Sequence, residues 1–222
     1  MNKSRTWLMM FFLTLVFTAI SQARQSPVNK WEAEIKKFEE SDRQNPPAKG
    51  AVLFIGSSSI RGWQSLAEDF PGIKVTNRGF GGSEIADSTF YADRIVIPYR
   101  PRIVVFYAGD NDLANGKTPQ QVFDDYKAFV SRVQRKLPTT RIAFISIKPS
   151  PARASILQSM KDANALIKAY VSDDKSLIYI DVFTPMLRSD GSPRPELFGP
   201  DRLHMNREGY SLWKSVVAQY IR

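Results

Sequence analysis

The chain has 222 residues, of which 43% are hydrophobic, and it contains no cysteine. This length and composition predict one globular domain with a full hydrophobic core, and they exclude a disulfide-rich scaffold. The formal net charge is +9 at pH 7. Because no basic run is interleaved with aromatic residues, the charge indicates a generally basic surface rather than a nucleic-acid partner. Attraction to anionic polymers is the alternative interpretation.

The first segment of the chain has the features of a secretory signal. Lys3 and Arg5 precede a largely apolar run over residues 7–20, and Ser21-Gln22-Ala23 offers a small-residue cleavage site. The apolar run is shorter than the roughly 20 residues that span a bilayer. Cleavage would remove both basic residues and lower the net charge by two, to +7. An uncleaved membrane anchor is the alternative.

We therefore expect residues 1–23 to be a signal peptide and residues 24–222 to form a single exported domain, periplasmic or extracellular in a bacterium, without stable membrane insertion. Within this domain, residues 24–48 are expected to hold a leading helix and a linker. Apolar side chains recur there at helical spacing from Trp31 onward, and a proline pair then ends the helix.

Short strand-like apolar runs alternate with helix-like stretches along the rest of the chain. The strand-like runs are residues 51–55, 73–76, 103–107, 142–147 and 177–180. The clearest helix-like stretches are residues 119–136, 156–171 and 207–221. This alternation predicts an α/β protein, a three-layer α/β/α sandwich with a central parallel sheet of about five strands, flavodoxin-like. Ligands of such sheets bind outside the carboxyl ends of the strands.

Polar and glycine-rich blocks follow the strand-like runs or precede the last helix. They are Gly56-Ser57-Ser58-Ser59, Asn77-Arg78-Gly79-Phe80-Gly81-Gly82-Ser83, Gly109-Asp110-Asn111-Asp112 and Asp201-Arg202-Leu203-His204. A serine attacks an ester only when a nearby base accepts its proton, and any of the three consecutive serines meets that chemical requirement. His204 is the only histidine in the chain. Taken singly, the blocks also suit helix caps and ordinary turns.

The four blocks, in this order, resemble those of the SGNH hydrolases, also called GDSL-type esterases. That family is named for a Ser, a Gly, an Asn and a His in four separate blocks, and the resemblance runs from about Ala51 to the C-terminus. Gly62-Trp63 complete a pattern that is frequent in the branch of platelet-activating-factor acetylhydrolase-like and carbohydrate acetylesterase-like members. The first block departs from the family at Ser57, which stands where an acidic residue is usual.

The resemblance implies a role for each matching residue. Ser58 would be the nucleophile, His204 the base, and Asp201 the carboxylate that holds the imidazole in the productive tautomer. The backbone N–H groups of Ser58 and Gly82, with the side-chain amide of Asn111, would form the oxyanion hole.

The expected function is that of a cofactor-free exported serine esterase that removes a short acyl group, acetyl above all, from a small-molecule or glycan ester. One histidine and no cysteine argue against a metal site, and no phosphate-binding glycine motif is present. Two alternatives remain open: a lysophospholipase or thioesterase of the same fold, and a non-catalytic glycan-binding protein, which the departure at Ser57 suggests.

Several further residues have two interpretations in the sequence. Phe80, Tyr107 and Phe198 either line an acyl pocket or belong to the core, and the core is favoured for Tyr107. Arg153 either meets the substrate or is solvated surface, and solvated surface is the expectation. Asp112 is expected to orient its loop.

Overall fold

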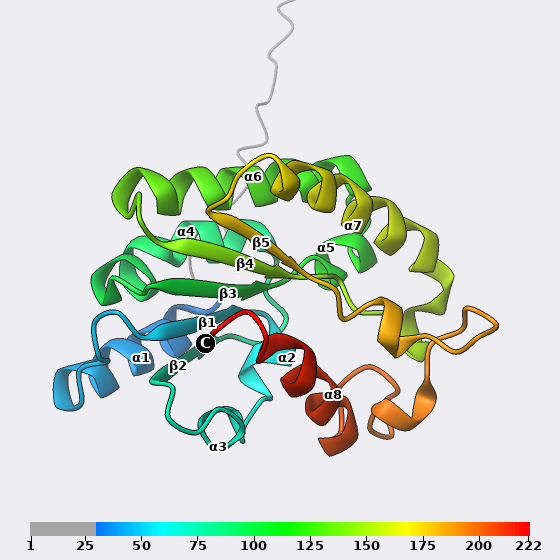
Figure 1. The fold of residues 1–222 in the computed structure, drawn as a ribbon, viewed down its shortest axis with the longest axis horizontal. Helices are drawn as coiled ribbons and strands as arrows, with labels where there is room; N and C mark the ends of the chain where they lie inside the picture. Colours follow the sequence, from blue (N-terminus) through cyan, green and yellow to red (C-terminus); the bar gives the residue numbers. More distant parts are fainter. Residues whose placement is uncertain (1–29) are drawn as a thin grey trace, which may run out of the picture.

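The computed structural model describes residues 30–222, so the predicted signal peptide lies outside the described residues. Five parallel strands form one sheet in the order β2-β1-β3-β4-β5 (Figure 1). The strands are β1 (Val52–Gly56), β2 (Val75–Gly79), β3 (Ile103–Tyr107), β4 (Arg141–Ile145) and β5 (Leu177–Ile180). This order confirms the predicted flavodoxin-like sheet and places the topological switch point between β1 and β3.

Helices cover both faces of the sheet. One face packs against α1 (Glu32–Gln44), α4 (Ile85–Ile95), α6 (Pro119–Lys136) and α7 (Leu157–Ser172). The other packs against α2 (Ser58–Arg61), α3 (Leu66–Asp69) and α8 (Arg207–Val217). Along β1, Leu53 and Ile55 join the first core and Val52 and Phe54 the second, as alternation along a strand requires. The predicted three-layer sandwich is confirmed.

Short helices complete the connections between these elements. They are α5 (Asp110–Ala114), η1 (Ile97–Tyr99), η2 (Pro151–Ile156), η3 (Thr184–Met186) and η4 (Pro195–Leu197). Among residues 30–222, no helix is both long and apolar enough to cross a membrane.

Strand β2 and helix α4 differ most from the sequence-based expectation, while β4 and α8 end earlier than predicted, at Ile145 and Val217. Strand β2 begins later than predicted and continues through Gly79, because the backbone of Asn77 to Gly79 pairs with β1 although these residues carry no apolar pattern. Helix α4 was absent from the predicted elements because its buried face includes Asp87 and Ser88, which break the apolar periodicity. The side chains of Glu84 and Asp87 form a capping box at its start.

Asp69 fastens α8 to the segment that follows β1. Its carboxylate, whose side chain is 1% exposed, accepts a hydrogen bond from Trp63 Nε1 at 2.8 Å and two from Arg207, at 2.8 and 2.9 Å. The Trp63 ring also packs against Tyr210 and Trp213 of α8, with centroids 5.5 and 6.0 Å apart. The residues before α8 therefore occupy a defined position relative to the end of β1.

Replacing Asp69 tests this attachment. Asp69→Ala should lower the free energy of unfolding by about 2 kcal/mol, because it leaves a buried indole N–H without its acceptor. The hydrogen bonds from Arg207, which outweigh the opposing effect of burial, hold the pKa of Asp69 well below its usual range. The stabilisation is therefore complete above the unfolded-state value of about 3.9 and declines as pH falls further.

Urea unfolding of both proteins at several pH values measures this difference. The difference in free energy of unfolding between wild type and Asp69→Ala should be largest at pH 7 and should decrease below about pH 4. Asp190→Ala is the control, since Asp190 is exposed and bonds only to its own loop. Equal stability of wild type and Asp69→Ala at pH 7, or a gap that widens in acid, would contradict the attachment.

Candidate active site

The chain leaves β1 through a peptide unit that is bonded on both sides. The Gly56 carbonyl accepts from Phe80 N at 2.9 Å, and Ser57 N donates to the Tyr107 carbonyl at 3.0 Å. Gly56 has a φ of +137°, and a Cβ there would lie 1.8 Å from the Tyr107 oxygen. Only glycine fits this position. Ser58, two residues after Gly56, begins α2 at the carboxyl edge of the sheet.

The three consecutive serines occupy different environments. Ser57 and Ser59 are 0% and 2% exposed, and neither Oγ has a hydrogen-bond partner among the described residues. Ser57 stands at the N-cap position of α2, yet its side chain makes no capping bond. Ser58 is half-buried and is the serine that solvent reaches.

Ser58, His204 and Asp201 form a hydrogen-bonded row. Ser58 Oγ lies 3.1 Å from His204 Nε2, and His204 Nδ1 lies 2.5 Å from Asp201 Oδ2. The other carboxylate oxygen of Asp201 accepts the backbone N–H groups of Leu203 and His204, each at 3.0 Å. The bond from the His204 ring, followed by these two, lowers the pKa of Asp201 well below its usual range, so the carboxylate is ionised.

Helix α8 holds the loop that carries His204. Asn206 caps this helix, since its side chain accepts from Gly209 N at 3.0 Å. The Tyr210 hydroxyl, one turn into the helix, donates to the Ser59 carbonyl at 3.1 Å. Figure 1 shows α8, in red, beside α2. These contacts fix the histidine loop against the serine loop.

The blocks that contain Gly82 and Asn111 contact each other at the carboxyl edge of the sheet. Gly82 is exposed and has a φ of +72°, and a Cβ there would meet no atom within 4 Å. Asn111 lies in α5, and its side-chain Nδ2 donates to the Ser83 carbonyl at 3.0 Å. Both blocks flank β1, one after β2 and the other after β3, so they border the loop that carries Ser58 on opposite sides.

Asp112 holds the Asn111 block against the start of α4. Its side chain is fully buried, and it accepts from Ile85 N at 3.2 and 3.3 Å and from Lys117 Nζ at 2.8 Å. Burial raises the pKa of Asp112 to about 6, although Lys117 opposes the shift. Asp112 therefore connects α5 to the start of α4 just after the Gly82 block, in agreement with its expected role in orienting the loop.

Two expectations about side chains near the site are decided by burial. Phe80, Tyr107 and Phe198 are 0%, 0% and 6% exposed and belong to the two cores. The expectation that Arg153 is solvated surface is wrong: its side chain is 16% exposed and lies 2.8 Å from the carboxylate of Asp110. The sequence offered no signal for this contact, because 43 positions separate the two residues.

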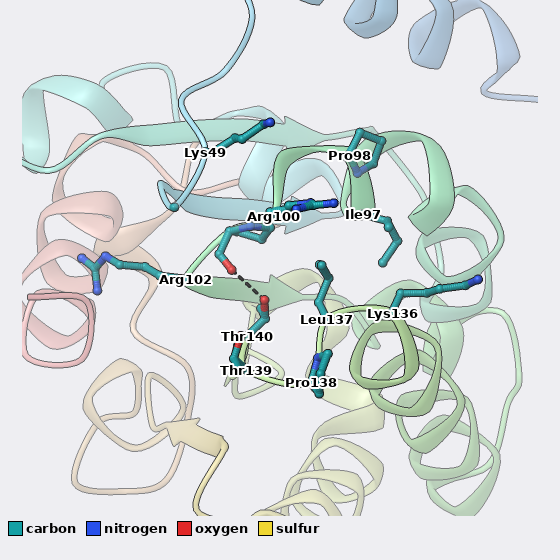
Figure 2. A pocket seen from close by; sticks show the side chains of 12 residues that line it. Lys49, Ile97, Pro98, Arg100, Arg102, Lys136, Leu137, Pro138, Thr139 and Thr140 are labelled. Atoms are coloured by element: carbon teal, nitrogen blue, oxygen red, sulfur yellow. Dashed lines mark hydrogen bonds between the residues drawn. The ribbon is translucent and has the colours of Figure 1, made fainter.

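A hollow of about 910 Å³ lies at the opposite, amino-terminal edge of the sheet. Its lining includes Lys49, Arg100, Arg102 and Lys136, but none of the predicted site residues. In Figure 2 the side chains of Arg102 and Lys136 extend in opposite directions. Arg102 also donates a hydrogen bond to the Ile221 carbonyl. These cations do not converge on one ligand position.

Fold and site together define an α/β protein with a serine, histidine and aspartate row at the carboxyl edge of a parallel sheet. The sequence pattern of the GDSL-like Lipase/Acylhydrolase family matches residues 48–212. The chain belongs to this family, and it is a carboxylic ester hydrolase.

Individual relatives agree with this assignment. Platelet-activating factor acetylhydrolase IB subunit alpha1 of Homo sapiens is 25% identical over 191 residues, covering 82% of this chain and 78% of the relative. A GDSL-like lipase from Bacteroides thetaiotaomicron superposes with a TM-score of 0.74 at 22% identity, covering 85% of this chain and 97% of the other. A variant acetyl-xylooligosaccharide esterase from Geobacillus superposes with a TM-score of 0.62 at 15% identity, covering 78% of this chain and 95% of the other.

A fluorophosphonate probe tests which serine is reactive. We expect one covalent adduct per chain, on the peptide that contains Ser58, because this hydroxyl alone of the three contacts a base and is open to solvent. Intact-mass and peptide mass spectrometry measure the adduct. Ser58→Ala should remain unlabelled, and Ser57→Ala, as the matched control, should still be labelled. An adduct on Ser57 or Ser59 would contradict the assignment.

Proposed function

We propose that the protein is an exported serine esterase that hydrolyses short-chain esters, acetyl esters above all, on carbohydrates through an acyl-enzyme intermediate. The observation that carries this proposal is the row formed by Ser58, His204 and Asp201, with distances of 3.1 and 2.5 Å. Export rests on the signal-like features of residues 1–23.

In the acylation step, Ser58 Oγ attacks the ester carbonyl carbon while His204 Nε2 accepts the hydroxyl proton. The carbonyl electron pair moves onto oxygen, and this oxyanion receives hydrogen bonds from the N–H groups of Ser58, Gly82 and Asn111. Collapse of the intermediate breaks the bond to the alcohol, which leaves with the proton from His204. Asp201 accepts the Nδ1–H bond and stabilises the imidazolium throughout.

Deacylation repeats these steps with water as the nucleophile. His204 accepts a proton from water as the water oxygen attacks the acyl carbon on Ser58. The second oxyanion occupies the same hydrogen-bonding position, and its collapse releases the carboxylic acid. Ser58 Oγ then regains the proton from His204, which restores the free enzyme.

The burial of apolar side chains supports a short acyl group. The three aromatic residues that could have lined an acyl pocket, Phe80, Tyr107 and Phe198, are packed in the cores. Among residues 30–222, Phe90 is the one large hydrophobic side chain with high exposure, at 53%, and it lies on α4. A long acyl chain gains its binding energy from apolar surface, and the described residues offer little of it.

The openness of the site supports a carbohydrate alcohol. The side chains of His204 and Asp201 are each 51% exposed, so a substrate larger than a simple ester would itself cover the reacting groups. Two relatives named above are an acetylhydrolase and an esterase of acetylated xylooligosaccharides. These names agree with an acetyl group and, in one case, with a carbohydrate.

Hydrolysis of p-nitrophenyl acetate, butyrate and octanoate by residues 24–222 tests the acyl preference. Activity should be highest with acetate, should fall with chain length, and should vanish in Ser58→Ala but persist in Ser57→Ala. Acetylated xylooligosaccharides should then release acetate, measured by ion chromatography. Preference for octanoate would favour the lysophospholipase or thioesterase alternative, and no activity above Ser58→Ala on any ester would favour the glycan-binding alternative.

Replacing Asp201 tests the role of its charge. Asp201→Asn retains an oxygen for the two backbone N–H groups but removes the carboxylate that orients the imidazole, so kcat should fall about 10³–10⁴-fold. The temperature of unfolding should stay close to wild type, because the side chain is half-exposed. Asp190→Asn is the matched control, since Asp190 also accepts a backbone N–H two residues on. A loss of less than tenfold would remove Asp201 from the proposed mechanism.

A further inference from the structure

A buried cluster of three charged side chains lies next to Asn111, a residue of the proposed oxyanion hole. Asp110 follows β3, Lys148 follows β4, and Arg153 lies in η2. Asp110 Oδ2 is 3.1 Å from Lys148 Nζ and 2.8 Å from Arg153 Nη1. The side chains of Asp110 and Lys148 are only 4% and 1% exposed.

The cluster has a surplus of positive charge. Burial by itself would raise the pKa of Asp110, but Lys148 and Arg153 outweigh this effect and lower the pKa, so the carboxylate is ionised. Two cations then face one anion. Buried ion pairs are on average neutral or unfavourable for stability compared with apolar side chains of similar volume. Fold stability alone therefore gives a weak reason for this cluster.

Arg153 connects the cluster to Asn111. One guanidinium nitrogen, Nη1, lies against Asp110, and the other, Nη2, donates to Asn111 Oδ1 at 2.8 Å. The same amide donates from Nδ2 to the Ser83 carbonyl at 3.0 Å. An amide rotated by 180° would set its NH₂ group against the guanidinium and its oxygen against the Ser83 carbonyl. Arg153 and Ser83 therefore determine which way the amide faces.

The hydrogen-bond inventory of Asn111 leaves one donor for a ligand. A side-chain NH₂ group carries two hydrogens, and Ser83 accepts one of them. A charged donor on Oδ1 also polarises the amide, which strengthens the remaining N–H as a donor in a site of low dielectric constant. Preorganised donors of this kind contribute most when they are fixed before charge develops on the substrate oxygen.

We propose that Arg153, held by the Asp110 carboxylate that Lys148 also contacts, is a positioning residue that orients and polarises the side-chain amide of Asn111 toward the developing oxyanion. This inference rests on the proposed function, because it takes Asn111 as an oxyanion donor for an attack by Ser58. It adds three residues to the site, none of which the sequence assigned to it. The loop of Arg153 also contacts the histidine loop, since Ala152 N donates to the Arg202 carbonyl at 3.1 Å.

A double-mutant cycle with p-nitrophenyl acetate tests the proposal. Asn111→Ala removes the donor and should lower kcat about 10²–10³-fold. Arg153→Met keeps the length of the side chain but leaves the donor unfixed, and kcat should fall roughly tenfold or more with KM little changed. If Arg153 acts through Asn111, adding Arg153→Met to Asn111→Ala should change kcat by less than about twofold.

Two further variants separate positioning from folding. Arg153→Lys keeps a cation beside Asp110, but its single nitrogen cannot reproduce both guanidinium contacts. Its unfolding temperature should therefore approach that of wild type, while kcat stays low. Arg141→Met is the matched control at the opposite end of β4, where Arg141 is exposed, and its kcat should equal that of wild type.

The outcomes distinguish this inference from the function on which it rests. If the wild-type protein shows no Ser58-dependent hydrolysis, the proposed function fails. If wild type is active, the positioning role is overturned when Arg153→Met lowers kcat by the same factor with and without Asn111. It is also overturned when Arg153→Lys or Arg153→Met matches wild type in kcat.

Discussion

The peptide unit between Gly56 and Ser57 is the constraint on which the site depends. Its carbonyl is bonded to the segment that leaves β2 and its N–H to the end of β3, at 2.9 and 3.0 Å. The next residue is Ser58, so the hydroxyl that we propose as the nucleophile follows a backbone segment fixed to three parallel strands. No side chain fits at Gly56, because a Cβ would overlap the carbonyl oxygen of Tyr107. A shifted or rotated peptide here would move Ser58 away from His204 and from the proposed oxyanion donors.

His204, the proposed base, is held beside Ser58 by a different set of contacts. His204 precedes α8, which packs on the sheet face opposite α6 and α7, and aromatic contacts with Trp63 and the bond from Tyr210 hold this helix near α2. The row from serine to aspartate is thus assembled from segments 146 positions apart. Asp201 is held in place by local hydrogen bonds, since one of its carboxylate oxygens accepts two backbone N–H groups of its own loop.

Much of this arrangement follows from local sequence pattern. β3 is a continuous apolar run buried on both faces, and α6 has a regular stripe and a Thr118 cap, so both were predictable to the residue. The extension of β2 through Gly79 depends on pairing with β1, and α4 depends on buried polar side chains, so neither follows from apolar periodicity. The contact between Arg153 and Asp110 was inaccessible for a stronger reason: only the folded sheet brings the ends of β3 and β4 together.

The two halves of the site differ in their exposure, and the difference fits their chemistry. His204 and Asp201 are half-exposed, so in the proposed mechanism a proton passes to a leaving alcohol or from water without a buried relay. Asn111 is instead backed by charged groups that water barely reaches, Asp110 and Lys148 being almost fully buried. An electrostatic contribution is larger where the effective dielectric constant is low. Fixed positive charge therefore suits the proposed oxyanion donor Asn111, and exposure to solvent suits the proposed proton-transferring groups.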